Sequence, residues 1–389
     1  MFRNKKDNRQ LTTDNRLLST VNCQLQLLLI LVASALLFSC GGNTSSPLMG
    51  QGDTIPMRYA KNITMVRYGE SVVEVELKNP WGEGLLGTYI LTSDPDAIPP
   101  YEGGTPVITT PLKNALVFTA VHCGLICEFG MEESIGGVCE KQYIHGLTKD
   151  VVDCGNGMSP NQELIIKLRP DAMLVSPFES NTGHDKLGQL GMPIIECAEY
   201  MEETALGRAE WMKFYGILFG KEKEANAMFD ALVARYDSLS ALVKHSSQRP
   251  RILSEELYGN VWYQPGVHST IGQLYADAGA QTAFPDYQQS GSVPLSAEQV
   301  YATAHDADIW LMRYEADQPI TLADLATGAD IYSRFDAFKQ GNVWGCNTRT
   351  SRFYERSPFH PDRMLSDIIQ ITHPEVKLHE PMYFYQRLK

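Results

Sequence analysis

Residues 221–244, KEKEANAMFDALVARYDSLSALVK, decide the architecture of this chain. Apolar residues recur there at steps of four and three, the spacing that lines one face of an α-helix. The stripe consists of Ala225, Phe229, Leu232, Tyr236, Leu239 and Val243. A helix of about 24 residues, at about 1.5 Å per residue, spans about 36 Å. Because that length can cross a whole molecule, the helix is predicted to join two parts of the fold.

On both sides of this helix, short apolar strands alternate with helical segments. Before it we expect strands at 114–120, 136–139, 172–177 and 193–197, and helices at 122–130, 159–168 and 186–190. After it we expect strands at 251–258 and 308–313, and helices at 270–277, 296–304 and 361–372. Such alternation is typical of mainly parallel sheets covered by helices. The predicted fold is therefore α/β, with two lobes joined by one long helix.

Residues 55–93 have a different pattern, which predicts a small β-rich element. β-type residues alternate there, and Tyr68-Gly69 and Asn79-Pro80 are turn signals. The glycines of Gly82-x-Gly84-x-x-Gly87 match a dinucleotide-binding spacing, but such a site needs a strand before it and a helix after it. We interpret this motif as a β-turn.

The first 40 residues have the features of a secretory leader. Five basic residues precede the apolar run Leu27–Phe38, which is too short to span a bilayer. Leu37-Phe38-Ser39-Cys40 resembles a bacterial lipobox, which implies that Cys40 carries a lipid. The predicted divisions are a signal peptide (1–39), a lipid-anchored tether (40–54), a β-rich extension (55–104), an N-terminal lobe (105–200), connecting helices (201–248) and a C-terminal lobe (249–389).

Charge and cysteine content limit the partners of the chain. The whole chain has 33 basic and 46 acidic residues, and without residues 1–39 the numbers are 28 and 44, a net charge of −16. This acidic balance argues against binding to nucleic acid, which needs basic patches. Six cysteines follow Cys40, without the close pairs typical of zinc sites, and their disulfide pattern is left open: Cys123, Cys127, Cys139, Cys154, Cys197 and Cys346. We expect no bound metal and no cofactor.

Several motifs, in order, resemble the substrate-binding proteins of ABC importers for ferric siderophores, haem and cobalamin. Leu168-Arg169-Pro170-Asp171 before an apolar strand is one, and Ser296-Ala297-Glu298-Gln299-Val300 is another. The set continues with 278–280, 307–310, 338–344, 361–369 and His373-Pro374-Glu375, so that the resemblance covers about residues 107–389. The extension at 55–93 looks like one seen in members from the Bacteroidetes. The resemblance implies a monomeric binding protein, not an enzyme, that holds a solute between its lobes and delivers it to a membrane permease and its ATPase.

Large, partly apolar chelates call for aromatic walls and a few charged groups. The segment 349–356 combines both, and its Phe353-Tyr354-Glu355-Arg356 is similar to a tract of cobalamin-binding members. The expected ligand-binding residues are Arg349, Arg352, Phe353, Tyr354 and Arg356 in this segment, Tyr258, Trp262 and Tyr263 earlier in the same lobe, and Tyr143 in the other lobe. The resemblance also implies one exposed glutamate per lobe that contacts the permease, matched by Glu298 and by Glu179.

Two other functions are compatible with the sequence. A direct metal-ion receptor or metallochaperone would require that residues among His122, His145, His268 and His360 converge. A surface lipoprotein with the same fold would bind no solute. Gly-x-Ser-x-Gly, P-loop and His-Glu-x-x-His motifs do not occur in the sequence, so it offers no catalytic set. The sequence does not choose between cobalamin, haem and a ferric siderophore: the aromatic-Glu-Arg tract favours a corrinoid, and the arginines favour an anionic ferric complex.

Overall fold

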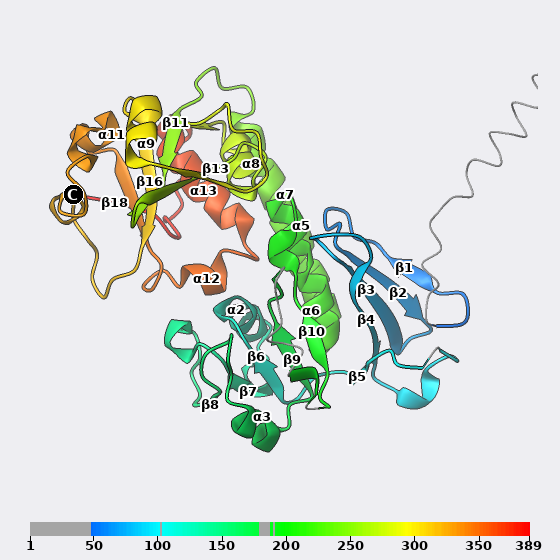
Figure 1. Ribbon diagram of the computed structural model, residues 1–389. Coiled ribbons are helices and arrows are strands. Elements are labelled where there is room, and N and C mark those ends of the chain that lie inside the picture. The colour runs from blue at the N-terminus through cyan, green and yellow to red at the C-terminus, as the bar shows by residue number, and fades with distance from the viewer. Residues whose placement is uncertain (1–47, 102, 179–186, 190) are drawn as a thin grey trace, which may run out of the picture. The chain divides into compact units, whose positions relative to one another are not determined.

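The computed structural model describes residues 48–101, 103–178, 187–189 and 191–389 (Figure 1). The chain divides into two compact units, residues 1–49 and 50–389, and the second unit contains every element discussed below. Cys40, the predicted signal peptide and part of the tether lie outside the described residues. Within the described part of the chain, no helix is both long and apolar enough to cross a membrane.

The β-rich extension forms a five-stranded sheet in the order β1-β2-β3-β4-β5. Gly69, at φ +63°, makes the tight turn between β2 and β3. The first four strands are antiparallel, whereas β5 runs parallel to β4 and lies beyond the predicted boundary at residue 104. The strands are β1 (Asp53–Ile55), β2 (Ile63–Tyr68), β3 (Val72–Lys78), β4 (Leu85–Thr92) and β5 (Val107–Thr109).

The N-terminal lobe is built on a sheet in the order β10-β9-β6-β7-β8, in which all pairings are parallel. Its strands are β6 (Ala115–Val117), β7 (Ile135–Val138), β8 (Val152–Asp153), β9 (Ala172–Val175) and β10 (Ile194–Glu196), and its helices are α2 (Ala120–Glu128) and α3 (Gln162–Leu168). The cap of α3 differs from the prediction: Asn161, not Ser159, accepts the N–H of Leu164, so Pro160 lies before the helix. Of the helix expected at 186–190, residues 187–189 are described, and 187 and 188 are helical.

Three consecutive helices connect the lobes: α5 (Ala205–Glu210), α6 (Met212–Leu218) and α7 (Glu222–Val243). The long helix is confirmed, and its 22 residues are one fewer at each end than predicted. All six residues of its apolar stripe are buried. Figure 1 shows α7 running past both lobes, and its contacts extend from α6 to α13 (Pro361–Thr372) of the C-terminal lobe.

The C-terminal lobe contains a second mainly parallel sheet, ordered β14-β11-β16-β17-β18, in which only β18 is antiparallel. A separate antiparallel sheet, β12-β13-β15, was not expected. Glu255, at φ +59°, lies between β11 and β12, so the strand predicted over 251–258 is divided between the two sheets. The strands are β11 (Arg251–Ser254), β12 (Leu257–Tyr258), β13 (Val261–Pro265), β14 (Gln281–Thr282), β15 (Ser292–Leu295), β16 (Ile309–Tyr314), β17 (Val343–Asn347) and β18 (Gln386–Arg387).

The helices of this lobe agree with the sequence where local signals are strong. The predicted spans 270–277 and 361–372 match α8 and α13. Ser296 and Gln299 form the predicted capping box at the start of α9. The helices are α8 (Thr270–Asp277), α9 (Ala297–Ala304), α10 (Leu322–Ala326), α11 (Asp336–Lys339), α12 (Phe353–Arg356) and α13 (Pro361–Thr372). The fold class, two α/β lobes joined by a long helix with a small N-terminal β element, is confirmed.

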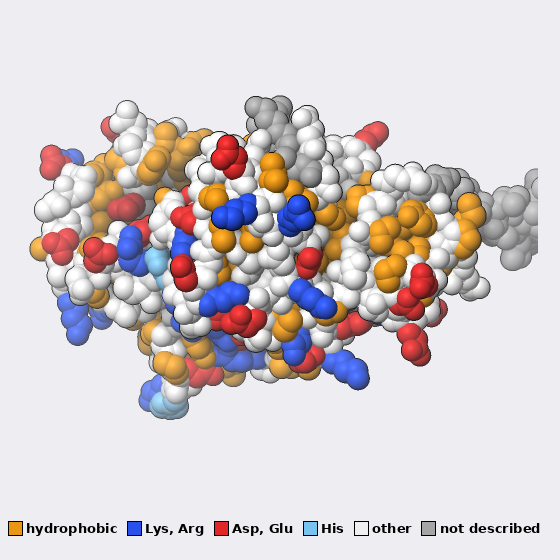
Figure 2. Space-filling model, turned by 90° about the horizontal axis from the view of Figure 1, so that it is seen from below, with side chains coloured by type: hydrophobic (Ala, Val, Ile, Leu, Met, Phe, Trp, Pro, Cys, Tyr) orange, Lys and Arg blue, Asp and Glu red, His pale blue; other side chains and the backbone are white. Residues whose placement is uncertain are grey.

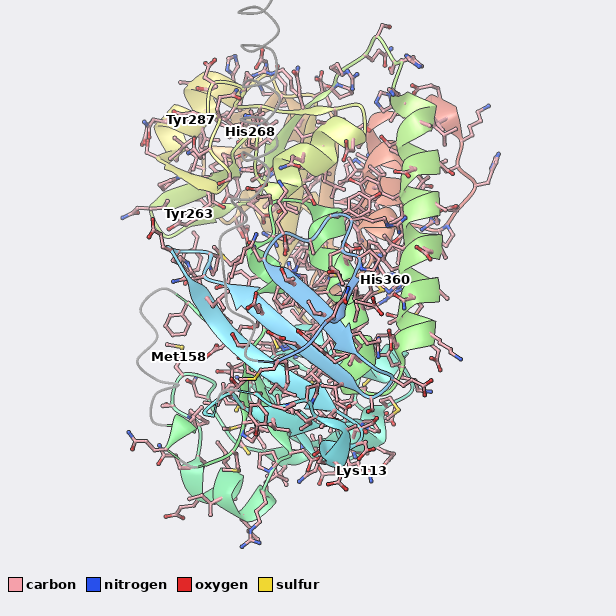
Figure 3. All side chains as sticks on the ribbon, turned by 90° about the vertical axis from the view of Figure 1, so that its right-hand side faces the viewer. Lys113, Met158, Tyr263, His268, Tyr287 and His360 are labelled. Atoms are coloured by element: carbon pink, nitrogen blue, oxygen red, sulfur yellow. The ribbon has the colours of Figure 1, made fainter. Side chains whose placement is uncertain are left out.

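The small sheet is attached to the connecting helices through buried carboxylates. Glu210 of α5 accepts the backbone N–H groups of Arg58, Tyr59 and Ala60 at 2.9, 2.7 and 3.0 Å. Nearby, Glu202 accepts those of Lys61 and Asn62, both at 2.9 Å. Figures 1 and 3 both show the small sheet beside α7. The extension is therefore packed against the bridge between the lobes.

Candidate binding site in the cleft

A cavity of about 450 Å³ lies between the two lobes. Its walls begin directly after the carboxyl ends of parallel strands: β6 leads to Phe118, β7 to Glu140, β16 to Glu315 and β17 to Thr348. Ligands of open α/β sheets bind outside the carboxyl ends of the strands, and the parallel sheets of both lobes present those ends here. The full lining is Phe118, Thr119, Ala120, Val121, Glu140, Tyr143, His145, Glu315, Thr348, Arg349, Arg352, Tyr354 and Glu355.

The N-terminal wall contains the start of helix α2. Thr119 caps this helix by accepting the N–H of His122, and Ala120 and Val121 of the first turn line the cavity. A helix start carries a partial positive charge, because its first N–H groups have no partner within the helix. Tyr143, which is half exposed, adds an aromatic ring to the same wall. This wall thus suits a ligand with apolar surface and an electron-rich edge.

The C-terminal wall contains two arginines that are paired with carboxylates. Arg349 lies 2.8 Å from Glu315 and 3.4 Å from Asp317. Arg352 donates through Nε to Glu355 at 2.8 Å. Guanidinium groups pair with carboxylate, catecholate or phosphate oxygens, but these two must exchange or share their present partners to do so. The cavity therefore offers oriented donors without a strongly positive net charge.

Four of the nine predicted ligand-binding residues line the cavity: Tyr143, Arg349, Arg352 and Tyr354. Phe353 is instead buried, packing edge-on against Phe384 and lying under Arg313. Arg356 lines a smaller cavity, of about 230 Å³, bounded by Ser351 and Tyr383 among others. Consecutive residues of the one-turn helix α12 point in different directions, so one tract cannot present all of its side chains to one ligand.

Tyr258, Trp262 and Tyr263 are not brought into the cavity. Trp262 has no exposed surface and packs among Trp310, Tyr332 and Phe335 in the core of the C-terminal lobe. Tyr258 is 81% exposed beside the hairpin turn, and Tyr263 is partly exposed on β13 (Figure 3). The sequence signal was aromatic type together with a position just past the first strand of the lobe, which does not distinguish core residues from ligand contacts.

The histidines do not converge on one point. His122 is buried 3.4 Å from Glu199, whereas His360 lies 2.7 Å from Glu128. Figure 3 shows His268 and His360 well apart, and only His145 of the four lines the cavity. In the described part of the chain, no three His, Cys, Asp or Glu side chains are grouped so that they could hold a metal ion. The six cysteines after Cys40 are all free thiols.

The cavity also includes residues that sequence reasoning did not select. They are Phe118, Thr119, Ala120, Val121, Glu140, Glu315, Thr348 and Glu355. Most of them follow the ends of predicted strands, so the strand-end rule for parallel sheets could have found them. Glu355 was named only as part of the aromatic tract, and nothing local indicates that its carboxylate is buried.

One of the two predicted permease-docking residues lies within the described part of the chain. Glu298 is exposed in the first turn of α9. Glu179 lies outside the described residues. In the view of Figure 2, basic and acidic side chains are interspersed over the N-terminal lobe rather than separated into patches.

Comparison with known proteins places this architecture in a family. A family model for periplasmic binding proteins matches residues 124–350, more than half of the chain. The chain therefore belongs to the periplasmic binding protein family, as the motifs predicted.

Two uncharacterized lipoproteins of Methanocaldococcus jannaschii are each 23% identical to the chain. The first match covers 88% of this chain and 87% of the relative, and the second covers 81% of this chain and 84% of the relative.

Solved structures share the fold. The molybdate periplasmic binding protein of Haemophilus influenzae is 14% identical, covers 71% of this chain and 90% of its own, and has a TM-score of 0.58. A TroA-like periplasmic binding protein of Veillonella parvula is 14% identical over 72% of this chain and 96% of its own, with a TM-score of 0.54. The periplasmic heme-binding protein of Roseiflexus sp. RS-1 is 16% identical over 67% of this chain and 99% of its own, with a TM-score of 0.53. At these identities, the likeness concerns the fold.

Proposed function

We propose that this chain is the lipid-anchored solute-binding component of an ABC importer and that it carries a metal chelate in the cleft between its lobes. The observation that carries the proposal is the cavity of about 450 Å³, lined from both lobes at the carboxyl ends of their parallel strands. This volume lies within the range of small-molecule sites. Proteins with the same fold include a heme-binding protein and a Fe³⁺-hydroxamate transport protein, which supports a chelate as the solute.

Among the chelates, the side chains in the cavity favour one with an anionic or carbonyl-rich edge. Arg349 and Arg352 supply donors on one wall, and the start of α2 faces them from the other lobe. Tyr143 and Tyr354 supply aromatic surface. The expectation of a corrinoid rested on the tract 353–356, of which only Tyr354 and Glu355 line the cavity. A haem or an anionic ferric siderophore is therefore the preferred solute, and cobalamin is the alternative.

A panel titration tests the proposal. The soluble chain, residues 41–389, is titrated calorimetrically with haem, an anionic ferric tris-catecholate siderophore and cyanocobalamin. We expect saturable binding of one chelate per chain. The double variant Arg349→Ala/Arg352→Ala should weaken that binding at least tenfold, whereas Arg249→Ala, an exposed arginine outside the cavity, should not. A folded protein that binds none of the three, or an unaffected double variant, would contradict the proposal.

The lipid anchor is tested separately. Lipidation of Cys40 is supported by the lipobox-like sequence and by the names of the two curated relatives, both described as lipoproteins. The variant Cys40→Ala should move from the membrane fraction to the soluble fraction and lose incorporation of labelled fatty acid. Membrane retention of a Cys40→Ala protein that carries no acyl label would exclude this mode of anchoring.

The same measurements address the two other functions. A metal-ion receptor should lose thermal stability when a chelator removes its metal, because the ion binds the folded state. No group of described side chains supports such a site, so we expect an unchanged melting temperature in EDTA. A surface lipoprotein without a solute should have the same melting temperature with every chelate of the panel.

A further inference from the structure

The carboxylate of Glu355 lies where the two walls of the cavity meet. Only 5% of this residue is exposed. Its Oε1 accepts the backbone N–H groups of Gly146 at 2.6 Å and His145 at 3.2 Å, both in the N-terminal lobe. Its Oε2 accepts Nε of Arg352 in its own lobe at 2.8 Å. One side chain thus joins a loop of one lobe to a cavity-lining arginine of the other.

Two glycines of the N-terminal lobe make room for this contact. A Cβ at Gly124 of α2 would lie 2.1 Å from the backbone oxygen of Glu355. A Cβ at Gly146 would lie 1.7 Å from Nη2 of Arg352 and 2.6 Å from Oε1 of Glu355. Any larger residue would displace α12 in the first case and the Arg352 side chain in the second. Figure 1 shows α12 next to α2, in agreement with the contacts between them.

A second polar contact ties the far end of α2 to the C-terminal lobe. Glu128, the last residue of α2, lies 2.7 Å from Nε2 of His360 and 3.6 Å from Arg363. The helix whose first turn lines the cavity is therefore held against the other lobe at two points along its length. Separation of the lobes would expose the Glu355 carboxylate and break both contacts.

We infer that Glu355 is a positioning residue that holds the two walls of the cavity at a preset distance, and that Arg352 couples this contact to the solute. Arg352 lines the cavity and also pairs with Glu355, so a solute anion that binds Arg352 changes the partner of the same carboxylate that joins the lobes. The coupling of Arg352 to a solute rests on the proposed function. The contact between the lobes does not.

The variant Glu355→Gln tests the contact without a solute. Its amide keeps one acceptor oxygen but places an N–H₂ group against either Arg352 or the N–H of Gly146, both of which are donors. Hydrogen exchange is followed by mass spectrometry in peptides that cover residues 140–150. We expect exchange at 145–146 to become at least tenfold faster, because one neutral amide oxygen cannot accept from both the loop and Arg352 and holds the loop less tightly. Glu163→Gln, an exposed glutamate on α3, should leave that exchange unchanged.

A second variant protects the test against a folding failure. Gly146→Ala retains Glu355, but its Cβ would lie 2.6 Å from the Oε1 that accepts the 145–146 N–H groups, so it should also speed exchange there. Haem is the probe of the binding arm: if wild-type protein binds it, Glu355→Gln should weaken binding at least tenfold. Unchanged exchange at 145–146 in both variants would overturn the inference, whether or not haem binds. If haem does not bind to wild-type protein, that result counts against a haem solute, and the exchange measurement alone decides the role of Glu355.

Discussion

At the scale of residues, buried carboxylates that accept backbone N–H groups hold distant segments of this chain together. Glu210 binds residues 58–60, Glu355 binds residues 145–146, and Asp367 accepts the N–H groups of Tyr383, Phe384 and Tyr385. A carboxylate is costly to bury, and it is tolerated only when hydrogen bonds and charges replace its water. Each of these residues is therefore expected to be sensitive to substitution.

Glu210→Gln should lower the free energy of unfolding by about 3 kcal/mol, because it leaves the buried Lys213 ammonium without its counter-charge. Burial alone would raise the pKa of Glu210, but hydrogen bonds from Lys213 and from residues 58–60 outweigh it and lower the pKa. The stabilisation is thus present at neutral pH and is lost as pH falls through this lowered pKa. Urea unfolding at pH 7 and at pH 4 measures both effects, and the difference between wild type and variant should be smaller at pH 4.

The matched control for this prediction is Glu203→Gln. Glu203 pairs with Lys61 on the surface, where both side chains are mostly exposed. Water screens such a pair, so the free energy of unfolding should not change measurably. Equal effects of the two substitutions would show that the carboxylate of Glu210 does not anchor the extension.

The free thiols should be unreactive in the folded protein. Burial raises the pKa of Cys127 to about 11, with a further contribution from the Glu132 carboxylate, and raises the pKa of Cys139 and of Cys346 to about 12. Because the thiolate is the reactive form, residues 41–389 should react slowly with Ellman's reagent at pH 8. After denaturation six thiols should react at once. A fast-reacting thiol in the native protein would contradict this assignment.

At the scale of elements, local signals decided where helices begin and end. The serine and glutamine of the α9 capping box, the proline at the start of α13 and the apolar stripe of α7 all act within a few residues of sequence. The predicted cap of α3 lies two residues early, because Ser159-Pro160 and Asn161 both carry start signals. The sheet β12-β13-β15 was not predicted, since β13 pairs with β15, which lies about 30 residues further along the chain.

Ser296→Ala should destabilise the protein by about 1 kcal/mol, because the Gln299 N–H loses its side-chain acceptor at the start of α9. The midpoint of urea unfolding measures this loss. Ser333→Ala removes a hydroxyl that bonds only to a nearby carbonyl on the surface, and it should have a smaller effect. If both variants unfold at the same denaturant concentration, the capping box does not stabilise this lobe.

At the scale of the whole molecule, the arrangement of the second unit suits a binding protein with a fixed bridge. The helices α5 to α7 join the lobes, and the segment between β1 and β2 is bonded to Glu210 of α5 and to Glu202, which lies just before that helix. Additional contacts at Glu128 and Glu355 join the lobes directly. The extension that the sequence left without a role is thus part of the support for the bridge.

Glu298→Lys should reduce uptake of the solute by cells at least fivefold and leave solute affinity unchanged. Glu298 is exposed at the start of α9, outside the cavity, and a reversed charge would repel the arginines that the family resemblance implies on the permease. Glu70→Lys, a reversal on an exposed turn of the small sheet, serves as the control and should leave uptake intact. If Glu298→Lys weakens solute binding, the docking role is incorrect.

The sequence by itself determined the α/β class, the family, the long helix, and the bounds of α8, α9 and α13 to within one residue. These features depend on periodicity, caps and turn residues, which act between near neighbours. Only the tertiary structure decided the site, because the cavity combines residues 118–145 with residues 315–355. Four of the nine expected ligand residues line the cavity, whereas Trp262 and Phe353 are buried in the core and Arg356 lines a second, smaller cavity. Side-chain type predicts what a residue can bind, but the packing of segments distant in sequence determines which residues face the same space.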